Sequence, residues 1–209
     1  LNGQLLKYVF MVVFTTALSF GLTYMFGYED EASSVPAEDE EAGAIIEEET
    51  TGTVPASLQD ETIISPIVGQ AVALENVNDP VFSSGAMGQG IAIKPTEGVV
   101  YAPADAEVTI AFATGHAFGL KTANGAEVLI HVGIDTVSMN GEGFDQKVAQ
   151  GDKVKAGDVL GTFDSAKIAA AGLDDTTMVI VTNTADYASV TPVANGAVAK
   201  GDAIIEVKA

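Results

Sequence analysis

The sequence predicts an all-β domain preceded by a transmembrane helix and a disordered acidic linker, on three observations. From Thr62 onward, short apolar runs rich in Val, Ile and Thr alternate with turn signals. This pattern is typical of an antiparallel β-sandwich or barrel. Residues 8–28 carry no charge, and residues 29–61 carry acidic side chains but no basic one. We therefore expect three segments: residues 1–28 with the membrane helix, the linker 29–61, and the domain 62–209.

The uncharged segment from Tyr8 to Tyr28 is long enough to cross a bilayer. At about 1.5 Å rise per residue it spans about 30 Å, the thickness of the hydrocarbon core. Aromatic residues near both of its ends are typical of the membrane interface. A signal peptide and a buried globular helix are the alternatives, and the length of the apolar run disfavours both. Because the chain begins with Leu1 and not with Met, we expect it to be the carboxyl-terminal piece of a longer protein.

The charge balance excludes nucleic acid as a partner. Nine Lys+Arg residues against 29 Asp+Glu residues give a net charge of -20, whereas a nucleic-acid binder needs basic clusters to neutralise phosphates. Residues 29–61 repel one another and have little apolar surface to bury, so we expect an extended, solvated tether. The rest of the chain can form a core, since hydrophobic residues make up 47% of the sequence.

Within the domain, apolar runs and turn signals predict the individual elements. Ser165 to Leu173 is the one stretch expected to be helical, with a cap-like Asp164 or Ser165 before it and Gly172 near its end. The stretches around 151–160 and 195–205 share a V-x-x-G-D pattern, which we interpret as a repeated hairpin of a barrel-sandwich hybrid. The runs expected to form strands are 91–93, 107–113, 127–132, 159–163, 178–182 and 203–207.

The chain contains only two histidines, His116 and His131. They lie on either side of an Ala-Asn-Gly turn, so pairing of residues 112–121 with 127–132 as antiparallel strands would bring both imidazoles to one face. His131 interrupts an apolar run, and a buried polar ring needs partners, because an unsatisfied group costs on the order of 1 to 3 kcal/mol. A structural pair of hydrogen-bonded histidines without a further role remains an alternative.

The residue types narrow the chemistry open to this pair. The absence of Cys excludes a thiol nucleophile and Cys-ligated metal sites. Zinc requires three or four ligands, and neither HExxH nor HxH spacing occurs, so we expect no metal and no cofactor. The sequence contains no G-x-S-x-G motif, which would indicate a serine hydrolase. Covalent catalysis with His as the nucleophile remains: one imidazole accepts a phosphoryl group, while the other imidazole and a hydroxyl such as that of Thr114 stabilise it.

Several short blocks of sequence together carry a family resemblance. In chain order they are Ser65-Pro66 with Gly69, Asn78-Asp79-Pro80-Val81-Phe82, Gly88 to Pro95, Thr114-Gly115-His116-Ala117-Phe118, Gly125, His131 to Val137, and Gly141-Glu142-Gly143-Phe144. With these blocks, residues 62–209 resemble the glucose-type enzyme IIA domain of the bacterial phosphoenolpyruvate-dependent sugar phosphotransferase system. Each block alone is weak, but their order along the whole domain is highly specific.

The resemblance implies roles for the site residues. His131 would be phosphorylated at Nε2, His116 would stabilise the transferred group, Thr114 would orient the pair, and the Gly133 carbonyl would orient the imidazole. The acidic positions that flank the family's site correspond to Asp79 and Asp135, for which capping and solubility are the alternatives. The apolar rim on which partners dock corresponds to Val81, Phe82, Phe112 and Val137, for which core packing is the alternative.

The resemblance also implies the partners of the domain. A IIA domain takes phosphate from the histidine-containing phosphocarrier protein and passes it to a Cys of a IIB domain, which phosphorylates sugar entering through a IIC permease domain. Because this chain has no Cys, the IIB unit must lie upstream or on another chain. Residues 8–28 look like the last span of a IIC domain, which would place the protein in the cell membrane with its IIA domain in the cytoplasm.

Three other functions stay open on the sequence. A lipoyl or biotinyl carrier would need a modifiable lysine at a hairpin tip, for which Lys153 is the nearest candidate. A zinc peptidase related by fold is disfavoured by having only two His. A regulatory binding module, which binds metabolic enzymes in its unphosphorylated form, is the third.

Overall fold

The structure is a computed structural model that describes residues 58–209. The predicted membrane helix 8–28 and the linker 29–61 up to residue 57 lie outside the described residues. Within 58–209, no helix has both the length and the apolar character needed to cross a bilayer.

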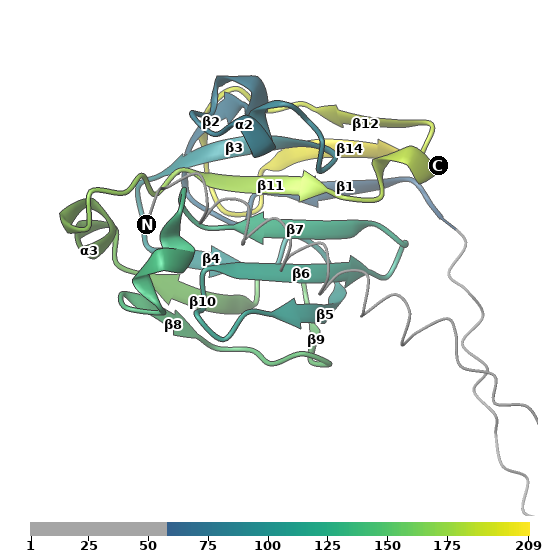
Figure 1. Ribbon diagram of the computed structural model, residues 1–209. Coiled ribbons are helices and arrows are strands. Elements are labelled where there is room, and N and C mark those ends of the chain that lie inside the picture. Colours follow the sequence, from purple (N-terminus) through teal and green to yellow (C-terminus); the bar gives the residue numbers. More distant parts are fainter. Residues whose placement is uncertain (1–57) are drawn as a thin grey trace, which may run out of the picture. The chain divides into compact units, whose positions relative to one another are not determined.

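All strand pairs between the named strands of residues 58–209 are antiparallel, which confirms the predicted all-β class (Figure 1). The large sheet contains, in spatial order, β13 (Gly196–Val198), β2 (Gly69–Ala73), β3 (Gln89–Pro95), β11 (Thr177–Val181), β7 (Glu127–His131), β6 (Ala117–Thr122), β5 (Ala106–Ala111) and β9 (Lys153–Val154). One smaller sheet contains β1 (Glu61–Ile64), β14 (Ala203–Lys208) and β12 (Ser189–Pro192); the other contains β4 (Val99–Tyr101), β10 (Val159–Phe163) and β8 (Phe144–Gln146). The finer assignment to a barrel-sandwich hybrid stays a prediction.

Each strand predicted from the sequence is present, with ends shifted by at most two residues. The predicted helix is also present, as α3 (Ser165–Ala170). It begins after Asp164, whose carboxylate accepts hydrogen bonds from the backbone N–H groups of Ala166 and Lys167. It ends before Gly172, which has a φ of 76°, so the start and stop signals of this helix are correct.

A second α-helix, α2 (Pro80–Ser83), is absent from the prediction. Asp79 caps it, and Pro80 occupies its first position, both of which are start signals. Its four residues are too few to show helical periodicity. Three short 3₁₀ turns were not predicted either: η1 (Leu74–Asn76), η2 (Thr136–Met139) and η3 (Thr184–Asp186).

The repeated Gly-Asp segments are not hairpins, so this interpretation is wrong. In each repeat the strand before the turn belongs to the large sheet (β9, β13) and the strand after it to a small sheet (β10, β14). The turns themselves are alike: Asp158 accepts from Lys155 N–H, and Asp202 accepts from Ala199 N–H, both at 2.8 Å. Lys153 lies in strand β9 and not at a hairpin tip.

The centre of the large sheet is buried on both faces. All five residues of β11 are buried, an apolar run without alternation that is expected of a strand covered on both sides. One face, with Ile130 and Val179, packs in the main core against residues of the small sheets. The other face, with Met178 and Ile180, packs against Phe82 of α2 and against Leu74 and Val77 before it. The unpredicted helix therefore closes the second face of the sheet.

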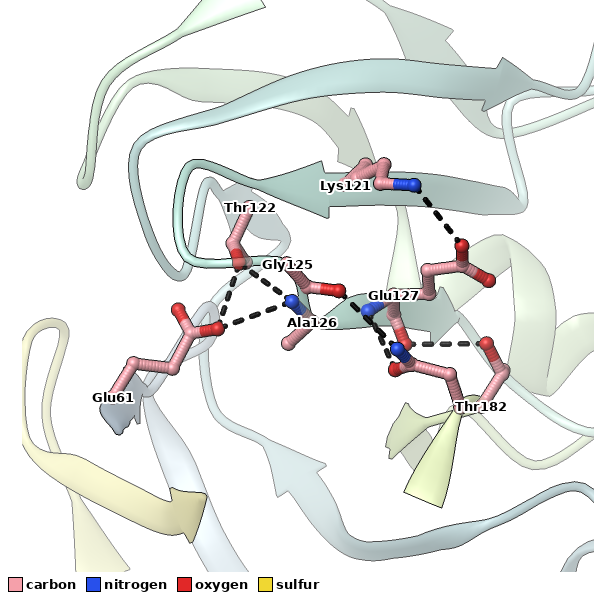
Figure 2. Close-up of polar contacts among 8 residues, drawn as sticks. Glu61, Lys121, Thr122, Gly125, Ala126, Glu127 and Thr182 are labelled. Carbon is pink, nitrogen blue, oxygen red and sulfur yellow. Dashed lines mark hydrogen bonds and ion pairs between the residues drawn. The ribbon is translucent and has the colours of Figure 1, made fainter. Parts of the chain in front are cut away.

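The hairpin of β6 and β7 is fixed at its turn by two neighbouring segments (Figure 2). From β1, Glu61 Oε1 accepts hydrogen bonds from Thr122 Oγ1 at 2.7 Å and from Ala126 N at 3.2 Å. From the segment after β11, Asn183 Oδ1 accepts from Glu127 N at 2.9 Å. Burial raises the pKa of the Glu61 carboxyl. Glu61 thus belongs to the folded domain, one residue before the predicted beginning at Thr62.

We predict that Glu61→Ala lowers the free energy of unfolding by about 1–2 kcal/mol, because the Thr122 hydroxyl loses its acceptor. Glu61→Gln keeps an acceptor oxygen and should restore most of the loss. The measurement is urea unfolding of the two variants, with Glu206→Ala, an exposed residue of β14, as the control that should change little. A loss for Glu61→Ala no larger than that of the control would contradict the anchoring role.

Candidate functional site

His131 is the last residue of β7, near the middle of the large sheet. It pairs with Ala117 of β6 on one side and with Met178 of β11 on the other. Its side chain is only 7% exposed. Because both flanking strands are hydrogen-bonded to β7, the backbone that carries this imidazole has a fixed position.

The carbonyl of Gly133 determines which ring nitrogen of His131 carries the proton. His131 Nδ1 lies 2.9 Å from Gly133 O, and a carbonyl oxygen can only accept a hydrogen bond, so Nδ1 is the donor. In the neutral ring, Nε2 then has a free lone pair. Gly133 has a φ of 77°, and a Cβ there would lie 2.4 Å from Thr136 Cγ2, so only glycine fits this position.

His116 lies in the turn between β5 and β6, directly beside His131. The two ring centroids are 5.0 Å apart in an edge-to-face arrangement, so the predicted meeting of the two imidazoles is observed. A strand over residues 112–121 is expected from the sequence, but His116 lies before β6 and not on it, because Gly115 with a φ of 68° turns the chain there. The hydroxyl of Thr114 lies 2.5 Å from His116 Nδ1. This hydrogen bond engages Nδ1 and not Nε2.

Burial keeps both imidazoles neutral. Desolvation lowers the pKa of His131 to about 4, against the opposing effect of its hydrogen bond to Gly133. Desolvation, followed by the charge of the neighbouring His131, lowers the pKa of His116 to about 3. Both rings are therefore uncharged at neutral pH, each with a single N–H proton, and a neutral imidazole with a free Nε2 is the nucleophilic form.

Two of the four predicted rim residues contact the histidine rings. The ring of Phe82 lies 5.1 Å from that of His131, and the ring of Phe112 lies 5.4 Å from that of His116, between centroids. Val81, beside Phe82 on α2, is 52% exposed, so it does not pack in the core. Val137 is half-buried in η2.

The two acidic residues have different surroundings. Asp79 Oδ1 accepts hydrogen bonds from Val81 N at 2.7 Å and Phe82 N at 3.2 Å, so its carboxylate caps α2 and positions Phe82 against His131. Asp135 is exposed, has a φ of 58°, and makes no capping bond with its side chain.

Sequence reasoning missed the residues that hold the Gly133 segment. Thr136 is fully buried, and its hydroxyl donates to Val132 O. It belongs to a block that matched the family, but no spacing signal indicates this contact. Within the described residues, no cluster of three or more His, Cys, Asp or Glu side chains is arranged to hold a metal ion.

Comparison with known proteins gives a consistent result. Residues 61–187 match the family model described as phosphoenolpyruvate-dependent sugar phosphotransferase system, EIIA 1. The chain is 45% identical over 196 residues to the PTS system beta-glucoside-specific EIIBCA component of Dickeya chrysanthemi, covering 94% of this chain and 29% of that protein. It is 46% identical over 142 residues to the PTS system glucose-specific EIIA component of Bacillus cereus, covering 68% of this chain and 86% of that protein.

A solved structure is similar as well. Glucose permease IIA from Mycoplasma capricolum superimposes with a TM-score of 0.65 at 34% identity, covering 71% of this chain and 96% of that one. The chain thus covers nearly all of that solved chain but less than a third of the Dickeya protein.

We predict that acid destabilises the domain through its two histidines. Their folded pKa values of about 4 and about 3 lie below the ordinary 6.5, so the unfolded chain takes up protons first as the pH falls below 6.5. Each histidine then removes about 1.4 kcal/mol of stability per pH unit until its folded pKa is reached. Urea unfolding between pH 7.5 and pH 5, followed by circular dichroism, measures this slope. His116→Gln/His131→Gln should flatten it, and equal slopes in the two proteins would contradict the neutral, buried pair.

Proposed function

The chain belongs to the phosphoenolpyruvate-dependent sugar phosphotransferase system EIIA 1 family, and on this premise we propose that it accepts a phosphoryl group at Nε2 of His131 and passes it on. The observation that carries the proposal is the hydrogen bond from His131 Nδ1 to the Gly133 carbonyl. It holds the proton on Nδ1 and leaves the Nε2 lone pair free to attack phosphorus.

The transfer needs no group other than the two imidazoles and the incoming donor. The Nε2 lone pair forms a bond to phosphorus, the N–P bond of the donor phosphohistidine breaks, and its electron pair returns to the donor ring. The His131 ring then carries positive charge, which the Gly133 carbonyl stabilises through Nδ1–H. A second transfer, to a thiolate, reverses these steps and restores the neutral ring.

His116 would stabilise the phosphoryl oxygens. If the Thr114 hydroxyl donates to His116 Nδ1, the proton of the neutral ring is on Nε2. The contact between the two rings brings that N–H within reach of a phosphoryl group on His131. Thr114 is thereby a positioning residue for His116, and Gly133 for His131.

The partners follow from the family and from the composition. We assign the histidine-containing phosphocarrier protein as donor and a IIB cysteine as acceptor, coupled to a IIC permease. The Dickeya relative carries B and C components in its name, which supports this pairing. The present 209 residues contain no Cys, so the acceptor lies outside them. The exposed Val81 and the ring-packed Phe82 and Phe112, with Val137 and the flanking Asp79 and Asp135, make up the surface that both partners meet.

The segment before the domain would attach it to a membrane. A match of 196 residues to the Dickeya protein is longer than the described range 58–209, so it reaches into the segment that precedes Leu58. This supports residues 8–28 as the last span of a IIC domain, followed by the linker predicted at 29–61, whose last residue, Glu61, belongs to the folded domain. Transfer from the phosphocarrier would require the IIA domain on the cytoplasmic side of the cell membrane.

We predict that incubation of the chain with phosphoenolpyruvate, enzyme I and the phosphocarrier gives an acid-labile phosphate on His131. His131→Ala should abolish the label, because no other nitrogen in the site has the same free lone pair. His116→Gln should still accept phosphate but pass it poorly to a IIB domain. Label that survives His131→Ala, or unchanged onward transfer by His116→Gln, would overturn these assignments.

A second prediction separates the two roles of Asp79. Asn is as good a helix cap as Asp, whereas Ala costs about 1 kcal/mol of cap stability. Asp79→Asn should therefore keep the phosphate acceptance rate of the wild type, and Asp79→Ala should slow it by releasing Phe82 from His131. Rapid-quench measurement of His131 phosphorylation tests this, and equal losses in both variants would instead assign the effect to the charge of Asp79.

A further inference from the structure

The Gly133 carbonyl belongs to a peptide group that is hydrogen-bonded at both of its polar atoms. Its oxygen accepts from His131 Nδ1 at 2.9 Å, and the N–H of the same peptide, on Ile134, donates to Asp174 O at 2.8 Å. A peptide group is planar, with its C=O and N–H pointing in opposite directions. The bond to Asp174 therefore sets the direction in which the Gly133 carbonyl points.

The preceding peptide group is held in the same way. The carbonyl of Val132 accepts from Thr136 Oγ1 at 2.5 Å, and the N–H of Gly133 donates to Thr176 O at 3.2 Å. Thr136 is fully buried, and its methyl group lies where a side chain on Gly133 would have to go. Thr136 thus holds the Gly133 segment both by a hydrogen bond and by packing.

The side chain of Asp174 shapes the turn that supplies the two acceptor carbonyls. Its Oδ1 accepts from Thr176 N at 2.8 Å and from Thr176 Oγ1 at 2.6 Å. This closes the turn between residues 174 and 176, whose backbone oxygens receive the N–H groups of Gly133 and Ile134. Asp174 is exposed, so replacing it does not open the core.

We propose that Thr136 and Asp174 are positioning residues, which act from two sides through the Gly133 carbonyl to hold His131 in the tautomer with a free Nε2. Neither side chain is hydrogen-bonded to the imidazole of His131, and neither is a candidate site residue from the sequence. The effect on the ring is independent of what the ring reacts with, and only its consequence for transfer rates rests on the proposed function.

Two pairs of variants test the proposal on the unphosphorylated 209-residue chain. With both ring nitrogens labelled with ¹⁵N, the chain has only two histidines to resolve, and His116→Gln assigns them. Thr136→Val and Asp174→Ala should lower the share of the His131 tautomer protonated on Nδ1. They should also slow phosphate acceptance roughly three- to tenfold, the range that corresponds to one hydrogen bond of ordinary strength.

The conservative partners provide the rescue. Thr136→Ser keeps the hydroxyl and Asp174→Asn keeps the Oδ1 acceptor, so both should restore the wild-type ring signals. Asp152→Ala is a matched control, since Asp152 is an exposed aspartate that accepts from Ala149 N in a similar turn; it should leave the ring of His131 unchanged. Should Thr136→Val fail to fold, the comparison of Asp174→Ala with Asp174→Asn, at an exposed residue, still tests the proposal.

Unchanged His131 tautomers in Thr136→Val and Asp174→Ala would overturn the proposal. Equal changes in the conservative variants or in Asp152→Ala would overturn it too, because the effect would then be a general loosening of the fold. If these variants show the tautomer change but the wild-type chain takes no phosphate, the proposed function is refuted and this inference stands.

Discussion

The site depends on one hydrogen bond, from Nδ1 of His131 to the carbonyl of Gly133. Without it, a neutral imidazole can carry its proton on either nitrogen, and the reactive lone pair has no fixed place. Burial lowers the pKa of His131 to about 4, so the doubly protonated ring is absent at neutral pH. The hydrogen bond then selects between the two tautomers of the neutral ring. One backbone oxygen thus determines which atom can react.

The fold holds the Gly133 carbonyl and the His131 ring in fixed positions relative to each other. β7 lies between β6 and β11 in the large sheet, and the hairpin it forms with β6 is fixed at its far end by Glu61 and Asn183. At the near end, α2 presents Phe82 to the ring of His131. β6 and β11 therefore fix β7 along both edges, segments that are distant in the sequence fix the β6–β7 turn, and α2 packs against the ring of His131.

Much of this arrangement was predictable, and the failures have physical causes. The runs rich in β-branched residues identified the strands, and a turn midway between two histidines indicated that they meet. A single turn of helix such as α2 has no periodicity to detect, although Asp79 and Pro80 are start signals. The Gly-Asp turns look like hairpins because local sequence does not encode which sheet a strand joins. The contact of Asp174 with Ile134 joins residues that are adjacent only after folding, so no local pattern reveals it.

The position of His131 at one end of the β6–β7 hairpin has a kinetic consequence. Gln59 N donates to Asn124 O in the turn of the β6–β7 hairpin, whereas His131 is the last residue of β7, four steps from the first, or about 14 Å at 3.4 Å per residue. The first described residues of the domain are thus held at the opposite end of the hairpin from the ring of His131. Under the proposed function, donor and acceptor both have to reach Nε2 of this one ring, so they can occupy the site only in turn. Such a carrier follows ping-pong kinetics, and either partner in excess inhibits the exchange.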